Sequence, residues 1–338
     1  MKMANIFSNK NILVTGGTGT VGTPVIDKLI DKGAKVTCVS LDSEERVKAV
    51  LNKKAEFIHA DLTIFENCFE VTKNIDYVIH LTAIKGSTQK GNLDAAKGYV
   101  AFVLCNTHMI DAAYKNNVKK FLYVGSINEY PPLSIRKEDD VWNGLPAAND
   151  KYSGIAKRVG EIQGEAYYEQ YGWDAFKIIR LSNVYGPYDD FCTKTCHVIP
   201  SLISKFYNTK NNRITIAGDG SAIRDFIYVE DVADACLLAL EKAKSNFPIN
   251  IGSGIGISIK ELALTIETNF GKNNKYILEF DKDLPKGDDV RILDISRANS
   301  HLHWNPRTKL NDGLKKTIDW YGANKLIADR RGKELHGL

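Results

Sequence analysis

Long apolar runs are missing from this sequence of 338 residues. No stretch approaches the roughly 18 to 20 uninterrupted apolar residues that a membrane span requires. The first residues, "MKMANIFSNKN", also lack the apolar centre of a secretory signal. We therefore expect a cytoplasmic protein with no membrane partner.

A charge excess of either sign is missing as well. The chain has 45 lysines and arginines against 41 acidic residues, a net charge of +4, and its basic residues are dispersed along the sequence. A nucleic-acid-binding protein usually gathers its basic residues on one face or one segment. We therefore expect no nucleic-acid partner, whereas a phosphorylated small ligand suits this balance.

Cysteine is sparse, with six residues in the whole chain. Cys38, Cys105 and Cys236 lie inside apolar patterns, which predicts reduced thiols in the core. Cys192, Cys196 and His197 form a C-x-x-x-C-H cluster, but no second pair of ligands with zinc spacing accompanies it. We predict that the protein has no metal site.

Short β-branched runs alternate with helical patterns through the first half of the chain. Five such runs are "NILVTG", "KVTCVS", "EFIHADL", "YVIHLTA" and "FLYVGSI", and a sixth, "AFKIIRLSNVYG", follows the helix that contains Lys157 and Glu161. Strands that alternate with helices predict an α/β protein with a Rossmann-type, doubly wound parallel sheet and right-handed crossovers.

Beyond about residue 187 the pattern changes to loops, short strands and helices. One helix is expected at "VEDVADACLLALEKA", and another after Ser258 and Glu261, which are spaced as a capping box. We predict a Rossmann domain over residues 8–187, a smaller α+β domain over 188–325 and a frayed tail over 326–338. Whether part of 213–252 returns to the first domain stays open.

A glycine-rich turn directly follows the first strand and opens a helix. Gly16, Gly19 and Gly22 stand in "TGGTGTVG", where the absence of side chains lets backbone amides and the helix N-terminus approach a pyrophosphate. The strand–turn–helix context makes this a strong dinucleotide signal, with Thr20 and Val21 also contacting the cofactor.

The ends of the next strands indicate which dinucleotide binds. Asp42 lies 20 residues after Gly22, about where an acid binds the ribose hydroxyls of NAD. The first cation after that strand, Arg46, is late for an NADP site, so we favour NAD over NADP. At the ends of the third and fourth strands, Asp61, Leu62 and Leu81 are expected to contact the cofactor, although Asp61 could instead cap a helix.

Several motifs occur in an order that carries a family resemblance: "TGGTGTVG", "HADL", "HLTA", "YVGSI", "AKRVGE", "RLSNVYGP" and "RDFIYVEDVADA". Over roughly residues 8–325 the chain resembles the extended short-chain dehydrogenase/reductases of the NAD-dependent epimerase/dehydratase family, which modify nucleotide sugars. The stretch "GPYDDFCTKTCHVIP" resembles the corresponding stretch of GDP-L-fucose synthases, which implies a GDP-linked sugar.

The resemblance implies roles for individual residues. It makes Ser126 the catalytic hydroxyl, Lys157 the lysine that holds the nicotinamide ribose and His197 an acid/base, and it places Arg224 at the nucleotide diphosphate. The remaining substrate-binding candidates are Asn128, Asn183, Lys205, Arg291 and, more weakly, Lys286. Relatives pair the helix holding Lys157 and the long one near 96–116 across a two-fold axis, which implies a homodimer or tetramer.

Two positions next to the catalytic serine depart from the relatives. Asn128 replaces the cysteine that fucose synthases use for epimerisation, and an amide cannot cycle a proton at neutral pH. Ile127 and Asn128 also replace the Asp-Glu pair of dehydratases. We therefore expect hydride transfer at C4 of a GDP-hexose or GDP-heptose. The alternatives are a 4-epimerase, an epimerase/reductase like fucose synthase, or a catalytically weakened protein that binds NAD and a nucleotide sugar.

A further departure lies in "DKYSGIAKRVGE". Four residues separate Tyr152 from Lys157, where the family has three, so on a helix their side chains lie about 140° apart. Ser153 takes the family's tyrosine position. We favour Tyr152 as the acid, with a π-bulge at Gly154 restoring the register and Asn149 or Asp150 capping the helix. Two alternatives remain open. Ser153 could act as a relay while His197 or Ser126 transfers the proton, or the site could bind its ligands without efficient turnover.

Overall fold

A parallel sheet forms the larger part of the protein. The computed structural model describes residues 5–83, 95–192, 196–271, 276–284 and 287–336. Within them the sheet has strand order β3-β2-β1-β4-β5-β7-β11, and every neighbouring pair is parallel, which confirms the predicted fold class. Its strands are β1 (Asn11–Thr15), β2 (Lys35–Ser40), β3 (Glu56–His59), β4 (Tyr77–His80), β5 (Lys120–Ser126), β7 (Phe176–Leu181) and β11 (Ile249–Ile251).

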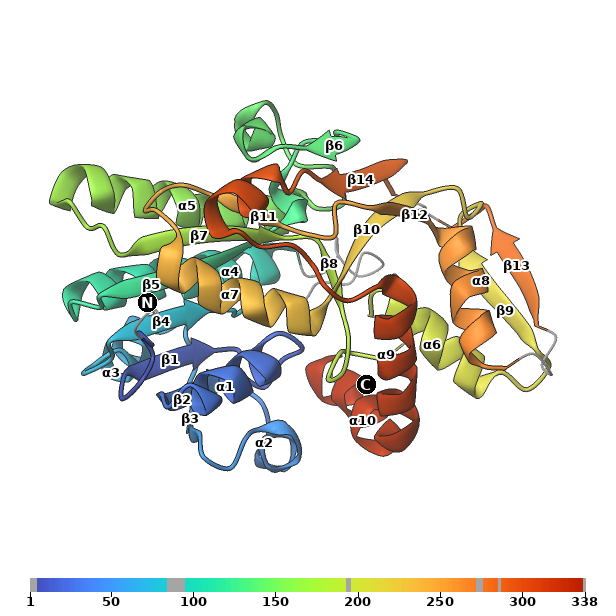
Figure 1. Ribbon diagram of the computed structural model, residues 1–338, viewed down its shortest axis with the longest axis horizontal. Helices are drawn as coiled ribbons and strands as arrows, with labels where there is room; N and C mark the ends of the chain where they lie inside the picture. The colour runs from blue at the N-terminus through green and yellow to red at the C-terminus, as the bar shows by residue number, and fades with distance from the viewer. Residues whose placement is uncertain (1–4, 84–94, 193–195, 272–275, 285–286, 337–338) are drawn as a thin grey trace.

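Helices cover both faces of this sheet (Figure 1). On one face α1 (Gly22–Asp31) packs beside α7 (Val229–Lys242), and on the other α4 (Ala95–Lys115) lies between α3 (Phe65–Val71) and α5 (Lys151–Tyr171). The short α2 (Glu44–Val50) follows β2. Because a parallel sheet is covered on both faces, its central strands are almost entirely apolar and buried.

The core of the larger unit consists of two layers between sheet and helices, and a separate cluster forms the core of the smaller unit. The layer under α1 and α7 contains Val25, Ile26 and Leu240, and the layer under α3 and α4 contains Cys105 and Met109. Each fully buried side chain of this size contributes about 1.5 to 3 kcal/mol to folding. The predicted core thiols Cys38, Cys105 and Cys236 are indeed buried, unpaired cysteines.

A smaller α+β unit lies beside the carboxyl ends of the large sheet's strands (Figure 1). One of its sheets has the order β12-β10-β14-β6, with β8 paired to β10, and the other pairs β13 with β9. Its strands are β6 (Ile135–Arg136), β8 (Asn183–Tyr185), β9 (Arg213–Ala217), β10 (Ile223–Tyr228), β12 (Gly256–Ser258), β13 (Ile277–Asp281) and β14 (Val290–Leu293). Its helices are α6 (Val198–Asn208), α8 (Ile259–Asn269), α9 (Leu310–Ala323) and α10 (Lys325–His336). The short helical segments are η1 (Ile127–Glu129), which packs on α5, η2 (Glu138–Trp142), and η3 (Ala298–Leu302), which packs on α7 and β11.

The chain passes between the two units more than once. The segment "AFKIIRLSNVYG" was predicted as a single strand, but it breaks at Ser182 into β7 and β8, which belong to different sheets. The Ser182 hydroxyl donates to the buried carboxylate of Asp225, 3.2 Å away on β10. After β9 and β10, α7 and β11 return to the large sheet.

The C-terminal tail is a helix, so the expectation of a frayed end was wrong. The α10 helix continues almost directly from α9, and Ala328 is fully buried against it. The Tyr321 hydroxyl donates to Asp329 at 2.8 Å, and Arg330 pairs with Glu45 on α2. These tertiary contacts stabilise a segment whose polar composition alone did not predict a packed helix. No helix in the described ranges is long and apolar enough to cross a membrane.

Candidate active site

The glycine-rich turn has the geometry of a phosphate-binding loop. Gly16 has a φ of +65°, and a Cβ there would lie 3.3 Å from the backbone nitrogen of Thr82. A Cβ on Gly22 would lie 2.4 Å from the Cα of Gly17, so a side chain does not fit. Val21 stands at the N-cap of α1 and offers no side-chain acceptor to the first-turn amides. The amides of Thr23 and Val25 donate to the Gly19 and Val21 carbonyl oxygens and Pro24 has no amide hydrogen, so a ligand's pyrophosphate would meet the Gly22 amide at the start of the helix.

The far side of this loop is tied to the segment before α6. The Thr20 hydroxyl donates to a carboxylate oxygen of Asp189 at 3.3 Å. The buried Arg46 donates to the carbonyl oxygens of Thr18 and Tyr188 at 3.2 and 3.3 Å. Thr20, one of the predicted cofactor residues, thus holds the loop against the segment that leads to His197.

Asp42 lies next to the same loop. The Thr18 hydroxyl contacts the Asp42 carboxylate and lies 3.1 Å from the Ser40 hydroxyl oxygen, so the acid is oriented just beyond β2. Asp42 is partly exposed, whereas the Arg46 guanidinium is buried against backbone carbonyls. A carboxylate at this place can accept hydrogen bonds from ribose hydroxyls.

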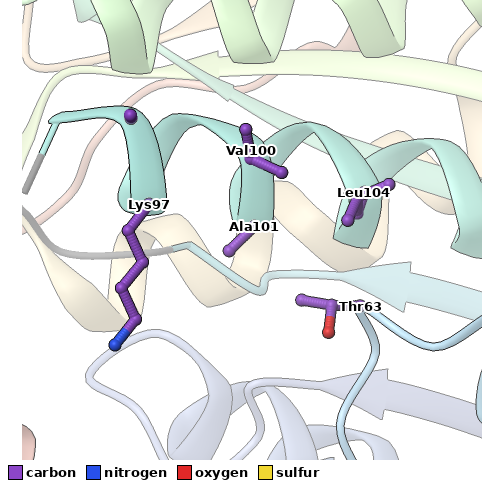
Figure 2. Close-up of a pocket in the computed structure, with 6 residues that line it drawn as sticks. Thr63, Lys97, Val100, Ala101 and Leu104 are labelled. Atoms are coloured by element: carbon purple, nitrogen blue, oxygen red, sulfur yellow. The ribbon is translucent and has the colours of Figure 1, made fainter.

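A groove of about 430 Å³ adjoins the end of the third strand. Figure 2 shows Thr63 facing Val100, Ala101 and Leu104 on α4, with the Lys97 side chain extending along one end. The largely apolar lining has the chemistry to hold a flat ring such as adenine. The backbone nitrogen and hydroxyl of Thr63 both donate to Asp61, at 2.9 and 2.8 Å, so Asp61 makes the turn into the groove.

The leucines predicted beside the cofactor border different parts of this region. Leu62 is 4% exposed and belongs to the core layer under α3 and α4, next to Asp61. Leu81 is half-buried, and its backbone carbonyl carbon would lie 3.4 Å from a Cβ on Gly16. Leu81 therefore lines the glycine turn, whereas the Leu62 side chain packs in the core near the end of β3.

Lys157 is buried where α5 crosses the carboxyl end of the sheet. Its ammonium nitrogen lies 3.4 Å from the Thr82 carbonyl oxygen and 4.9 and 5.0 Å from the ring centroids of Phe102 and Tyr123. Burial lowers the pKa of Lys157 to about 8, and an ionised Glu129 would act in the opposite direction. A lysine in this setting switches protonation state near physiological pH.

Ser126 ends β5 on the strand that carries Tyr123. Its hydroxyl oxygen accepts a hydrogen bond from the backbone nitrogen of Asn128 at 3.2 Å, and its own backbone nitrogen donates to Glu129 at 2.5 Å. This reciprocal capping of η1 fixes the serine side chain at the sheet edge. Lys157 contacts the same strand through the Tyr123 ring, and the resemblance's assignment of Ser126 and Lys157 to one catalytic site stays a prediction.

The helix α5 is regular from Lys151 to Tyr171, so the π-bulge expected at Gly154 is not formed. The physical reason for Gly154 is a close approach: a Cβ there would lie 2.3 Å from the carbonyl oxygen of Asn128. Asp150 stands at the N-cap position, but its side chain does not cap the helix and instead pairs with Arg291. The capping prediction for Asp150 was therefore wrong as well.

An uninterrupted helix keeps Tyr152 and Lys157 on different faces. The Tyr152 ring is 47% exposed and meets the Tyr99 ring of α4 edge-on, with centroids 6.1 Å apart. Ser153 shares the face of Lys157, four residues before it, and its hydroxyl donates to the Asp150 carbonyl at 3.1 Å. Neither hydroxyl contacts Lys157 in this arrangement, within the part of the chain that the structure describes.

A chain of ion pairs crosses the joint between the two units. Arg291 on β14 donates to the side-chain oxygen of Asn128 at 3.3 Å, pairs with Asp150 and lies 3.1 Å from Asp288. Asp288 also pairs with the fully buried Arg136 at 2.7 Å. Arg291, a predicted substrate-binding residue, is 7% exposed and its guanidinium is engaged by these three side chains, so its role toward substrate stays a prediction.

The other substrate-binding candidates in the described residues lie on β10, β8 and α6, with His197 directly before α6. Arg224 on β10 stands opposite Arg291 in the strand register, and burial, then the charge of Arg291, lowers its pKa. The side-chain amide of Asn183 on β8 donates to the Asp225 carbonyl oxygen on β10 at 2.8 Å, so it links these two paired strands. Lys205 donates to the Thr215 carbonyl at 2.7 Å, and burial lowers its pKa.

His197 is exposed at the N-cap position of α6, directly before the residues that begin the helix. Lys286 lies outside the described residues. Across those residues no three His, Cys, Asp or Glu side chains gather as a metal site would require.

Sequence analysis overlooked a buried group of charges behind Ser126. Arg180 pairs with Glu161 at 2.6 Å and lies 3.6 Å from Glu129, and all three are buried. Burial and the neighbouring Glu161 raise the pKa of Glu129 well above its usual range. Burial alone would raise the pKa of Glu161, but Arg180 lowers it. In the sequence, Glu129 could have indicated this group, because it is an acidic residue directly after an apolar strand.

Comparison with known proteins adds an independent finding. A model of the NAD dependent epimerase/dehydratase family matches residues 12–252. GDP-L-fucose synthase 1 of Arabidopsis thaliana is 33% identical, with 93% of each chain covered, and a putative UDP-glucose 4-epimerase of Methanocaldococcus jannaschii is 32% identical over 93% of this chain and 99% of that one. The structure of UDP-glucose 4-epimerase from Thermotoga maritima with UDP-glucose superposes with a TM-score of 0.81 at 28% identity, covering 93% of this chain and 99% of that one.

Proposed function

Because the chain belongs to the NAD dependent epimerase/dehydratase family and is an NAD(P)-dependent nucleotide-sugar enzyme, we propose that it transfers hydride at C4 of a GDP-linked hexose or heptose, using NAD. The observation that carries this proposal is the buried Lys157 at the carboxyl ends of the central strands, against Thr82 after β4 and Tyr123 of β5, the strand that Ser126 ends. Ligands of open α/β sheets bind at that edge.

The chain's own residues have separable tasks in this reaction. The glycine loop, Asp42 and the groove at Thr63 hold the dinucleotide, which supplies the hydride acceptor or donor when bound. Lys157 holds the nicotinamide ribose and, with a pKa of about 8, moves a proton at its ammonium nitrogen. The Ser126 hydroxyl, fixed by the Asn128 backbone amide, contacts the oxygen at the reacting carbon.

The choice of nucleotide rests on two observations. The relative named GDP-L-fucose synthase 1 matches 93% of the chain, and the stretch "GPYDDFCTKTCHVIP" resembles the corresponding stretch of fucose synthases. Arg224 stands at the joint between the two units, where a guanidinium suits a diphosphate. UDP-sugars are the natural comparison in any assay, since the Thermotoga maritima relative was solved with UDP-glucose.

A 4-epimerase is the second candidate, since relatives with that name match at 32% and 28% identity. The purified protein should be mixed with NAD(H) and with GDP- or UDP-linked sugars and 4-keto-sugars while nicotinamide absorbance is followed. An oxidoreductase changes the absorbance with substrate, whereas an epimerase converts the sugar with no net change. Turnover equal to that of a Ser126→Ala/Lys157→Ala double variant, with nucleotide-sugar binding retained, would instead indicate a binding protein.

A further inference from the structure

A buried histidine at the end of β4 has both of its ring nitrogens engaged. The Nδ1 atom of His80 lies 2.9 Å from the Thr15 hydroxyl oxygen on β1, and the Nε2 atom lies 3.1 Å from the side-chain oxygen of Asn106 on α4. The Asn106 amide nitrogen donates to the Ala156 carbonyl oxygen of α5 at 3.2 Å. At the other end, the Thr82 backbone nitrogen donates to the Thr15 hydroxyl oxygen at 3.3 Å. These contacts form the His80 network, which runs from Thr82 through Thr15, His80 and Asn106 to Ala156.

The ends of the His80 network determine the direction of its hydrogen bonds. A backbone carbonyl is only an acceptor, so the Asn106 atom that faces Ala156 is the NH₂ group and the Asn106 oxygen faces His80. That oxygen can only accept, so the imidazole carries a hydrogen on Nε2. In a neutral ring Nδ1 then has a lone pair, which accepts the hydrogen of the Thr15 hydroxyl.

The surroundings of His80 keep the ring neutral. Thr15, His80 and Asn106 are all fully buried. Burial, and then the positive charge of Lys157, lowers the pKa of His80 to about 3, although the hydrogen bond to Asn106 acts in the opposite direction. A protonated ring would direct a second N–H at Thr15 and place a cation near a buried ammonium, which is unfavourable. His80 is therefore the neutral Nε2–H tautomer at physiological pH.

Both ends of the His80 network lie next to Lys157. The Thr82 carbonyl oxygen lies 3.4 Å from the Lys157 ammonium nitrogen, and Ala156 directly precedes Lys157 on α5. Thr15 directly precedes Gly16 of the glycine turn, where an added Cβ would lie 3.3 Å from the Thr82 nitrogen. The network thus links the lysine, the carbonyl that accepts from it and the glycine turn.

We propose, building on the proposed function, that His80 is a positioning residue that holds the Thr82 carbonyl oxygen against the Lys157 ammonium. A hydrogen bond from an ammonium to a carbonyl oxygen favours the charged form of the lysine. If the network is broken, Thr82 moves away and Lys157 loses its proton at a lower pH. The other titratable side chains that act on Lys157 stay in place after such a change, namely Glu129, Glu161 and Cys105.

Two substitutions of similar shape break the network without changing Lys157. Thr15→Val removes the hydroxyl between Thr82 and His80, and Asn106→Leu removes the amide between His80 and α5. The dissociation constant of NADH should be measured from about pH 6 to 10, because this measurement needs neither sugar nor turnover. In each variant we expect NADH affinity to fall about 3- to 30-fold at pH 8 and the alkaline loss of affinity to begin about half to one pH unit lower.

A conservative variant and a matched control separate positioning from a general loss of stability. Thr15→Ser retains the hydroxyl and should restore the wild-type pH dependence. Thr107→Val makes the same replacement one residue after Asn106, where the hydroxyl donates to the Val103 carbonyl oxygen of its own helix at 2.8 Å, and should leave the pH dependence unchanged. Lower stability with an unchanged pH dependence in both Thr15→Val and Asn106→Leu would overturn the inference, as would an equal shift in Thr107→Val.

A second measurement uses the wild type alone, in case the variants do not fold. Nitrogen-15 NMR of the histidine-labelled protein should show His80 with a hydrogen on Nε2 and none on Nδ1 from about pH 5 to 9. Its ring is recognised by contact with the Tyr123 ring, whose centroid lies 6.1 Å away. A hydrogen on Nδ1 would overturn the inference. A wild type that converts no nucleotide sugar refutes the proposed function instead, and the NADH titrations and the NMR spectrum still decide the role of His80.

Discussion

Lys157 and Tyr152 share helix α5 but lie on different faces of it. The Lys157 ammonium is buried 5.0 Å from the Tyr123 ring centroid, whereas the half-exposed Tyr152 ring lies 6.1 Å from that of Tyr99. Because the helix has no bulge between them, the extra residue in the family motif moves the tyrosine away from the lysine's face. Lysine and tyrosine therefore do not form the usual catalytic pair in this arrangement.

This separation leads to a prediction about the proton donor. We expect Tyr152→Phe and Ser153→Ala each to retain turnover within about threefold. The Tyr152 hydroxyl lies on a different face of α5 from Lys157, and the Ser153 hydroxyl donates to the Asp150 carbonyl oxygen. Ser126→Ala should lower kcat by about 100-fold or more, in the range typical for a lost proton donor. Initial rates of the three variants, measured with the nucleotide sugar that the wild type converts fastest, test these expectations. A Tyr152→Phe variant without turnover would return the role to the tyrosine.

The local rules of the sequence were sufficient for much of this site. The glycine turn, the alternating strands and the capping box at Ser258 and Glu261 all depend on neighbours within a few residues, and the structure contains each of them. The tie between Arg291 and Asn128 joins residues 163 positions apart, and the helix α10 depends on contacts with α2 and α9. No periodicity or motif encodes such pairings, so they become visible only once the chain is folded.

Because the pKa of Lys157 is lowered, replacing this lysine should have opposite effects on stability and activity. A lysine pKa lowered from 10.5 to about 8 means that the folded state binds fewer protons than the unfolded state between those values. Stability therefore rises with pH through that window, and at pH 7 the buried charge costs about 3 kcal/mol. Lys157→Met should raise the free energy of unfolding at pH 7 by up to that amount and abolish turnover. Urea unfolding at pH 7 and 10 checks the sign, since the gain should shrink at the higher pH.

The same pKa predicts the alkaline limb of the activity profile. If the ammonium form is needed to hold the nicotinamide ribose, kcat/KM falls as the pH rises through about 8. Glu129→Gln removes a negative charge that raises the pKa of Lys157 only if Glu129 is ionised. Because burial keeps the Glu129 pKa high, we expect the variant's profile to shift little. A large acidic shift in Glu129→Gln would show that Glu129 is charged in the working enzyme.

Asp42 predicts the cofactor preference. Asp42→Ala should weaken NADH binding about tenfold or more through the loss of a charged acceptor for two ribose hydroxyls, and it should bind NADPH no worse than the wild type does. Titration of protein fluorescence with each cofactor measures both constants. Glu44→Ala is the matched control, since it removes an exposed acid of the neighbouring α2 that pairs with Lys48. A wild type that binds NADPH more tightly than NADH would contradict the assignment.

Two glycines near helix starts provide a paired test of how α5 is packed. Gly154 has no room for a methyl group, since its Cβ would lie 2.3 Å from the Asn128 carbonyl oxygen. At Gly98 on α4, no atom of the described residues outside the local helix backbone lies within 4 Å of the added Cβ. Gly98→Ala should therefore raise the free energy of unfolding by about 0.5 to 1 kcal/mol through helix propensity. Gly154→Ala should lower it by about 1 to 3 kcal/mol and also reduce kcat, because α5 has to move away from Asn128. Equal effects of the two substitutions would mean that α5 does not approach Asn128 this closely.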